Sequence, residues 1–267
     1  MNIYKAFLFT ALLTAIDIAI SFSAVYIMDF TDFEDDSIRH FLGIIDIIPF
    51  MISFSIILFL IWKVKVPWNT TIEKVKNING HIVLYLLILN VGLFIYDRPS
   101  FDFTRIIATI NNIPIDPFVN KEINGVSLFY EAISVLIVAP IFEELFFRKY
   151  MFVALQKKYS LNISILISSI CFSLVHLPSY SNLIPTFLFG VCCCIVYSRT
   201  KNILYTMFLH SLLNLNWLIA MRFGENYYNW IFELKFNFIY WLFVLMGILM
   251  VLFALRQIII ASSADRS

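Results

Sequence analysis

The sequence predicts an all-α protein, a polytopic membrane bundle of about eight transmembrane helices. Of its 267 residues, 61% are apolar and 14% are charged, and the mean hydropathy is +0.85. Soluble domains typically hold about 45–50% apolar and about 25% charged residues. Long apolar runs recur along the chain, and most approach the ~20 residues that a helix needs to cross hydrocarbon. A net charge of +1 without a dense basic cluster argues against a nucleic-acid partner.

Eight apolar runs are interpreted as membrane spans. They cover residues 4–29, 41–62, 82–96, 126–147, 162–177, 181–198, 202–221 and 236–259. The third and fifth runs are short. The segment 100–125 is the longest connection, and two prolines, Pro114 and Pro117, interrupt it. We expect it to contain a partly embedded helix at 103–112.

The first run follows Lys5 but is too long for the apolar core of a signal peptide, and no small-x-small cleavage site follows it. We therefore expect it to remain as a span. With the N-terminus inside, roughly two thirds of the 19 lysines and arginines fall on the inner side, as the cytoplasmic bias of basic loops requires. We expect an integral protein of a bacterial plasma membrane, in contact with membrane lipid, with both termini cytoplasmic.

Three polar residue sets interrupt the fourth, fifth and seventh runs. They are Glu143 and Glu144 with Arg148, Phe172 with His176, and His210 with Asn214. Ionisable groups within the membrane are costly, so they are candidates for a functional site. Helical residues four apart share a face, which pairs Glu144 with Arg148. Glu143 is rotated by roughly 100° from Glu144 and is left for chemistry.

Helical rise predicts that these sets meet at one depth in the membrane. If the fourth helix continues past Arg148 to about Lys158, it descends as far as the fifth helix then climbs, at ~1.5 Å per residue. Glu143 and His176 then reach the same level. His210, nine residues beyond Lys201, reaches it too. We therefore expect one site rather than three separate polar positions.

A carboxylate, two imidazoles and an amide in a dry cavity suit hydrolysis of a carbonyl centre. A buried carboxylate serves as a general base, histidine positions water, and an amide N–H stabilises an oxyanion. No serine or cysteine is placed as a nucleophile, so activated water is the expected attacking group. Glu143, His176 and His210 also fit a zinc site with an open position. The same groups work without a metal, and both alternatives stay open.

Each of these residues also has a structural interpretation. Glu144 with Arg148 is first an ion pair, and Phe172 is expected to pack against His176 and fix it. Pro140 kinks the fourth helix and frees a carbonyl, although proline is also simply tolerated in membrane helices. Asp17 and Asp46 either pair with nearby amides, which is the preferred interpretation, or line a path for protons or substrate. The four cysteines are expected to be reduced, as small apolar side chains; they are Cys171, Cys192, Cys193 and Cys194.

Three strings resemble the motifs of the CPBP intramembrane protease family, also called the CAAX-protease or Abi family. The strings are APIFEELFFR (139–148), FSLVH (172–176) and FLFGVCCCIVYSRTKNILYTMFLHSLLN (187–214), and the motifs are EExxxR, FxxxH and HxxxN. The resemblance covers about 130–220. It implies that Glu143 and His176 activate water and that His210 and Asn214 support the oxyanion, and a divalent metal has been proposed for the family. Lys149 stands where family members often carry glycine.

The resemblance divides one integral bundle into membrane spans with a connecting segment (1–125), a catalytic core (126–220), and a last span with a tail (221–267). The expected function is that of an intramembrane (metallo)endopeptidase that cuts a peptide or membrane-protein substrate near the cytoplasmic leaflet. The alternative is a catalytically silent scaffold or bacteriocin self-immunity protein of the same family. Proton-coupled transport is a third hypothesis, which the sequence weakens because it shows no inverted repeat.

Overall fold

A computed structural model of the chain describes residues 1–28, 35–60, 78–121 and 125–264, and every regular element in these ranges is a helix. Seven helical segments of the described chain are long and apolar enough to cross a membrane, and Leu161–Leu174 adds a shorter apolar helix. The predicted fold class, a helical membrane bundle, is confirmed. The predicted span ends at residues 29 and 62 lie outside the described residues.

The helices follow the predicted order with small shifts of their ends. They are α1 (Ile3–Met28), α2 (Asp35–Leu60), α4 (Gly80–Tyr96), α5 (Arg98–Phe101), α6 (Phe103–Ile110), the compound fourth segment described next, α10 (Leu161–Leu174), η3 (Tyr180–Asn182), α11 (Leu183–Thr200), α12 (Ile203–Phe223), α13 (Glu225–Glu233) and α14 (Phe238–Ala264). The helix expected at 103–112 is present as α6. Helix α13 lies between the predicted seventh and eighth spans, where no helix was predicted.

The fourth membrane segment runs from Gly125 to Gln156 as one compound helix, so its predicted extension beyond Arg148 is confirmed. Its pieces are α7 (Gly125–Ile133), η1 (Ser134–Val138), α8 (Ala139–Glu144), η2 (Leu145–Phe152) and α9 (Val153–Gln156). Both η1 and η2 are π-helical, with hydrogen bonds from i to i+5 that widen the helix and recur at functional sites. The six residues of α8 carry the two adjacent glutamates between these wider turns.

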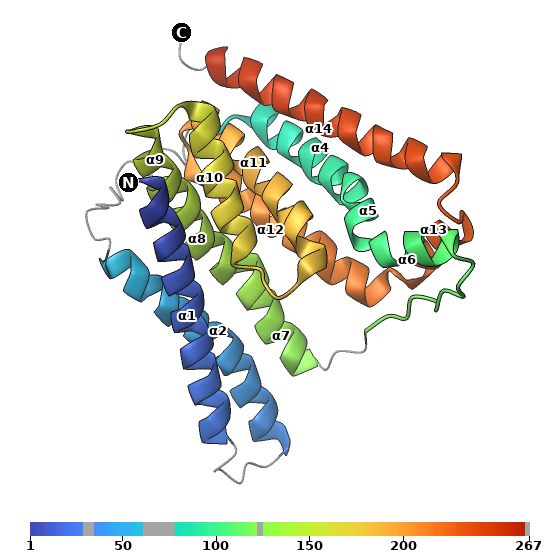
Figure 1. Cartoon of the computed structure of the whole chain (residues 1–267), viewed down its shortest axis with the longest axis horizontal. Helices are drawn as coiled ribbons and strands as arrows, with labels where there is room; N and C mark the ends of the chain where they lie inside the picture. The colour runs from blue at the N-terminus through green and yellow to red at the C-terminus, as the bar shows by residue number, and fades with distance from the viewer. Residues whose placement is uncertain (29–34, 61–77, 122–124, 265–267) are drawn as a thin grey trace.

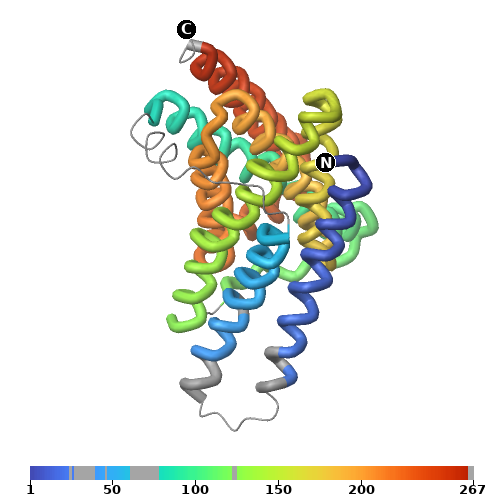
Figure 2. Tube along the Cα trace, turned by 90° about the vertical axis from the view of Figure 1, so that its left-hand side faces the viewer, coloured from blue at the N-terminus to red at the C-terminus, as the bar shows by residue number. Residues whose placement is uncertain are grey.

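Helix α12 lies at the centre of the bundle, where it contacts α4, α11, α8 and η1. Helix α10 packs between α11 and η2, and α4 packs along α14, as Figure 1 shows. The α1–α2 hairpin leans on α7 and α10 and extends away from the other helices (Figures 1 and 2). The first residue and the end of α14 lie in the half of the molecule where α9 turns into α10 (Figure 1).

Close backbone approach holds the α4–α14 pair together. A Cβ atom added at Gly247 would lie 2.9 Å from the carbonyl oxygen of Gly92, and one added at Gly92 would lie 3.0 Å from that of Gly247. Lipid tails are as apolar as leucine, so membrane helices associate through tight packing of small residues rather than through a hydrophobic driving force. These two glycines permit that packing, which fixes α4 as a support for α12.

Short capped turns set the register of the site helices. Ser160 accepts from the amide of Ile163 at the start of α10, and Asn202 accepts from that of Leu204 at the start of α12; such caps contribute about 1 kcal/mol each. Helix α11 ends at Lys201, whose φ of 52° is left-handed. The α11–α12 turn therefore spans only two residues and aligns α12 closely with α11.

The opposite end of the bundle is closed by α5, α6, α13 and the segment 111–121. Arg98 forms an ion pair with Asp102, and the Tyr240 hydroxyl donates to the same carboxylate at 2.9 Å. The Asn229 side chain accepts from the Phe118 amide and donates to the Phe118 carbonyl, which ties the irregular segment to α13. Asp102 thus joins α5 to α14 at this end.

Candidate active site

The three predicted residue sets meet in one buried cluster formed by α8, η2, the end of α10 and α12. Glu144 and Arg148 are fully buried, Glu143 and His210 are 6% and 4% exposed, and His176 is half-buried. These side chains come from three separate apolar runs, and helix extension to Gln156 brings their levels together, as the helical rise predicts. The structure thus brings residues of all three sets together, and their roles stay predictions.

Glu144 is shared between a cation and a histidine. Arg148 Nε lies 3.2 Å from Glu144 Oε2, as the i,i+4 spacing predicts. His210 Nδ1 lies 3.1 Å from Glu144 Oε1. A carboxylate at this position accepts hydrogen bonds, so Nδ1 of His210 carries the proton. Glu144 therefore fixes both the position and the tautomer of His210, which the sequence pattern did not indicate.

Phe172 lies at the centre of an aromatic group around the charges. Its ring is 5.0 Å from that of His176 and 5.9 Å from that of His210, centroid to centroid, and Arg148 Cζ lies 4.1 Å from its centroid. The predicted packing against His176 is present. The structure adds a cation–π contact, which contributes about 1–2 kcal/mol when desolvated. This contact matters because Nη1 and Nη2 of Arg148 have no hydrogen-bond partner among the described residues.

His176 has one ring nitrogen anchored and the other left for chemistry. Its Nδ1 lies 2.9 Å from the carbonyl oxygen of Phe172, and because a carbonyl only accepts, Nδ1 is the protonated nitrogen. In the neutral ring, Nε2 then carries the lone pair. Glu143 is close enough to His176 to interact with it electrostatically. The pair Glu143 and His176 thus presents a carboxylate and an unprotonated ring nitrogen to one region.

Glu143 is the less engaged of the two glutamates. Its Oε2 is buried and has no hydrogen-bond partner within the described chain, and it lies 3.8 Å from Nε2 of His210, beyond the usual hydrogen-bond distance of about 2.7–3.2 Å. A buried carboxylate oxygen without a hydrogen-bond partner costs free energy, and a catalytic role is one reason for a protein to keep such a group. The environments of Glu143 and Glu144 therefore differ in the direction that the spacing predicted.

Asn214 points to the compound helix. Its Nδ2 donates to the Val135 carbonyl at 2.6 Å, so one of its two N–H groups is already engaged. Ser211, one turn earlier on α12, donates to the Leu136 carbonyl at 2.7 Å. Both carbonyls lie in the turn before Pro140, which lacks an N–H to donate to that turn.

The predicted metal ligands Glu143, His176 and His210 are not gathered into one coordination sphere. Across the described residues, no group of three His, Cys, Asp or Glu side chains is arranged to hold a metal ion. His210 directs its two ring nitrogens to two different carboxylates. The side chains as they stand do not fit a zinc site, which takes three protein ligands at about 2 Å.

Other predicted residues have structural partners or lie outside the description. The Ser53 hydroxyl donates to Asp17 at 3.1 Å, so this acid pairs with a hydroxyl where an amide was expected. The side chain of Asp46 is outside the described part of the structure. The four cysteines are buried and free, in agreement with their predicted state.

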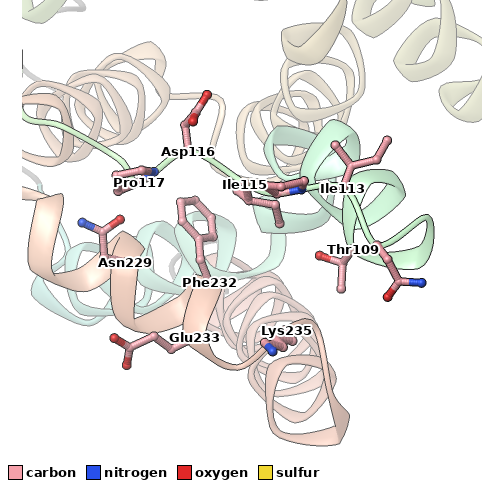
Figure 3. A pocket seen from close by; sticks show the side chains of 11 residues that line it. Thr109, Ile113, Ile115, Asp116, Pro117, Asn229, Phe232, Glu233 and Lys235 are labelled. Carbon is pink, nitrogen blue, oxygen red and sulfur yellow. The ribbon is translucent and has the colours of Figure 1, made fainter.

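A separate cavity lies at the opposite end of the bundle. It has a volume of about 560 Å³ and is formed by α6, the segment after it and α13, as Figure 3 shows. Its lining includes Thr109, Asp116, Asn229, Phe232, Glu233 and Lys235. No residue of the buried cluster lines it, so it is distinct from the candidate site.

Sequence reasoning missed several neighbours of the cluster because they are common apolar or hydroxyl residues. The Phe189 ring lies 4.9 Å from that of His210, and the Ser168 hydroxyl donates to the Phe147 carbonyl at 2.9 Å. Phe189 carries no signal in an apolar run. Ser211 could have been found, because Pro140 leaves a carbonyl that needs a donor.

Comparison with known proteins supports the resemblance over the core. Residues 125–216 match the family described as "Type II CAAX prenyl endopeptidase Rce1-like". A protein of Bacillus subtilis (strain 168), "Putative membrane peptidase YdiL", is 40% identical over 78 residues, which are 29% of this chain and 32% of the relative. A protein of Lactococcus lactis subsp. lactis (strain IL1403), "UPF0177 protein YxdF", is 35% identical over 79 residues, 30% of this chain and 43% of the relative.

These matches cover less than half the length of either curated relative. No solved structure matches the chain. All three motifs lie within residues 125–216, and the predicted resemblance to the CPBP family is confirmed for this core.

Proposed function

We propose that this protein, whose residues 125–216 carry the core of the CPBP family, is an intramembrane endopeptidase that uses activated water. Two observations carry the proposal, one on Glu143 and one on His176, which are close enough to interact electrostatically. Glu143 Oε2 is buried without a hydrogen bond among the described residues, and the anchoring of His176 Nδ1 leaves Nε2 unprotonated. Together they supply a base and an acceptor for one water molecule.

The proposed reaction begins when Glu143 takes a proton from water held against His176 Nε2. The resulting hydroxide attacks the scissile carbonyl and forms a tetrahedral oxyanion. The oxyanion then collapses and the C–N bond breaks while Glu143 gives its proton to the leaving amine nitrogen. This restores the Glu143 carboxylate and leaves a new carboxyl group on the other fragment. This reaction needs no covalent intermediate between enzyme and substrate, in keeping with the absence of a reactive serine or cysteine from the described cluster.

His210 and Asn214 are proposed to stabilise the oxyanion. Because His210 Nδ1 donates to Glu144, its Nε2 can donate only in the imidazolium form. In that form, the charges of His210 and Arg148 would balance those of the two glutamates, whose oxygens lie 3.1 Å and 3.8 Å from the ring nitrogens of His210. The free N–H of Asn214 would supply the second donor. Loss of one such donor typically lowers the rate about 10²–10³-fold.

Substrates are proposed to be peptides or membrane proteins cut near the cytoplasmic leaflet. Membranes from bacteria that lack the protein would be incubated with purified wild-type protein or Glu143→Gln, and released peptides identified by mass spectrometry. A farnesylated CAAX peptide serves as a second probe, because the matched family is described as a CAAX prenyl endopeptidase. Peptides released only by the wild-type protein support hydrolysis. The same peptides released by Glu143→Gln would refute it.

Glu131→Gln is the matched control, because Glu131 lies on α7 of the same compound helix and is half-buried. It should release the wild-type set of peptides. A cellular phenotype that survives Glu143→Gln, with no released peptides, would instead favour the scaffold or self-immunity alternative.

Metal dependence is tested separately. Since the three candidate ligands are not gathered, the proposed reaction predicts full peptide release after dialysis against a chelator such as 1,10-phenanthroline, with less than one zinc per protein by elemental analysis. Activity that disappears on chelation and returns with Zn²⁺ would contradict this prediction and would make Glu143, His176 and His210 ligands.

A further inference from the structure

The short helix α8 lies between two π-helical segments, and the first of these leaves carbonyl groups without their usual donors. The Ala139 amide donates to Ser134, so it is not available to Val135. Pro140 has no N–H, so it can serve neither Leu136 in an α-helical bond nor Val135 in a π-helical one. Val135 therefore has no backbone donor in either register, and Leu136 lacks its α-helical donor, so both carbonyls can accept from donors outside the helix.

Helix α12 supplies both donors. The Asn214 amide donates to Val135 at 2.6 Å and the Ser211 hydroxyl donates to Leu136 at 2.7 Å. Ser211 also lies 3.0 Å from the carbonyl of Met207 in its own helix. A hydroxyl has one hydrogen, and the shorter contact is the one between helices. A bond to the residue four positions earlier is the common alternative for serine, but here the carbonyl of Leu136 depends on it.

A second serine holds the segment on the other side of α8. The Ser168 hydroxyl of α10 donates to the carbonyl of Phe147 at 2.9 Å and both residues are buried. Helix α8 is thus held at its first end by α12, which carries His210, and beyond its second end by α10, which carries Phe172. The two hydroxyls lie on the helices that contribute the other site residues.

We propose that Ser211 is a positioning residue, which holds the helix of Glu143 in register with the helix of His210 by occupying the carbonyl that Pro140 leaves open. Ser211 follows His210 directly, so its bond to Leu136 joins the two helices within about two turns of both glutamates. The role of Ser211 in rate rests on the proposed function. Its role in geometry does not, and the two are measured separately.

The geometry is measured by the ¹⁵N spectrum of the imidazole rings in purified full-length protein in nanodiscs. The chain has only 4 histidines, so four rings are resolved, and His210→Gln assigns one of them. Ser211→Ala should shift the His210 signals, because Nε2 of His210 lies 3.8 Å from Glu143 and a change in the register of the two helices changes this distance. Ser211→Thr keeps the hydroxyl and should restore the wild-type spectrum.

Ser198→Ala is the matched control. Ser198 is also half-buried, and its hydroxyl donates at 2.8 Å to Ile195 within its own helix, so its loss should leave all four rings unchanged.

In a Pro140→Ala background, Leu136 regains a donor in its own helix, and Ser211→Ala should then shift the His210 signals by less than half as much. Unchanged His210 signals in Ser211→Ala would overturn the proposal. A shift that Ser211→Thr fails to restore would do the same.

Release of the farnesylated peptide then separates this inference from the proposed function. Ser211→Ala should lower kcat about tenfold with KM within twofold of the wild type, because the change acts on the orientation of Glu143 rather than on binding. If Glu143→Gln cleaves as well as the wild type, the proposed function fails while the ring spectra still decide the role of Ser211.

Discussion

At the scale of residues, two adjacent glutamates differ because their partners differ. Glu144 contacts Arg148 and His210, at 3.2 Å and 3.1 Å, whereas Glu143 Oε2 lies 3.8 Å from His210 Nε2, beyond hydrogen-bond distance. The i,i+4 spacing predicted the Arg148 contact. The His210 contact joins residues 66 positions apart, and no local pattern could have indicated it. We propose that these identical side chains serve support and chemistry according to their surroundings.

Glu144→Gln tests the supporting role. It keeps the shape of the side chain but leaves the fully buried Arg148 without a counter-charge, and removing one partner of a buried ion pair typically costs about 3–5 kcal/mol. We expect a large fall in the midpoint of thermal unfolding in detergent micelles. The comparison variant is Glu131→Gln, with no expected shift. A midpoint within a degree of the wild type for Glu144→Gln would contradict the assignment.

At the scale of elements, the long apolar runs and their depth were predictable, and the special turns were not. Counting the helical rise placed Glu143 level with His176 because it requires only helix continuity. The π-helical segments η1 and η2 depend on partners from α12 and α10. Helix α13 lies outside the predicted spans, and Asn229 ties it to the backbone of Phe118. Tertiary contacts decided each of these.

The α11–α12 turn offers a direct test at this scale. Lys201 has a φ of 52°, a left-handed conformation that costs side chains other than glycine about 1–2 kcal/mol. Lys201→Gly should therefore raise the midpoint of thermal unfolding or leave it unchanged, although glycine costs entropy elsewhere.

Lys157 is the matched control, since it also follows a helix but has a φ of −70°. Lys157→Gly should lower the free energy of unfolding by about 0.5–1 kcal/mol, and the midpoint should fall with it. If both glycine variants were destabilised equally, the strain assigned to the α11–α12 turn would be wrong.

At the scale of the whole molecule, the fold places polar chemistry inside an apolar bundle with the two ends of the described chain in the same half of the molecule (Figure 1). An even number of passes, seven long helices and the shorter Leu161–Leu174 of the described chain, agrees with that placement. The side on which the ends lie is a prediction from the basic loops. The sequence alone could predict this side of the membrane, because the preference of lysine and arginine for cytoplasmic loops acts before folding is complete.

The predicted orientation is tested with reporter fusions in bacterial cells. Green fluorescent protein after residue 267 should fluoresce, because it folds in the cytoplasm. Alkaline phosphatase joined after Gly224, between α12 and α13, should be active, because that connection is expected outside. An active phosphatase at residue 267 together with an inactive one at Gly224 would reverse the orientation and place the α9–α10 turn outside.

The most direct test of the account is the cleavage rate of Glu143→Gln in protein whose folding has been checked in the same sample. The account predicts an unfolding midpoint close to that of the wild type, because Glu143 Oε2 makes no hydrogen bond to the described residues, and a rate at least about 100-fold lower, because the general base is lost. A well-folded Glu143→Gln that cleaves at the wild-type rate would contradict the central claim that Glu143 activates water.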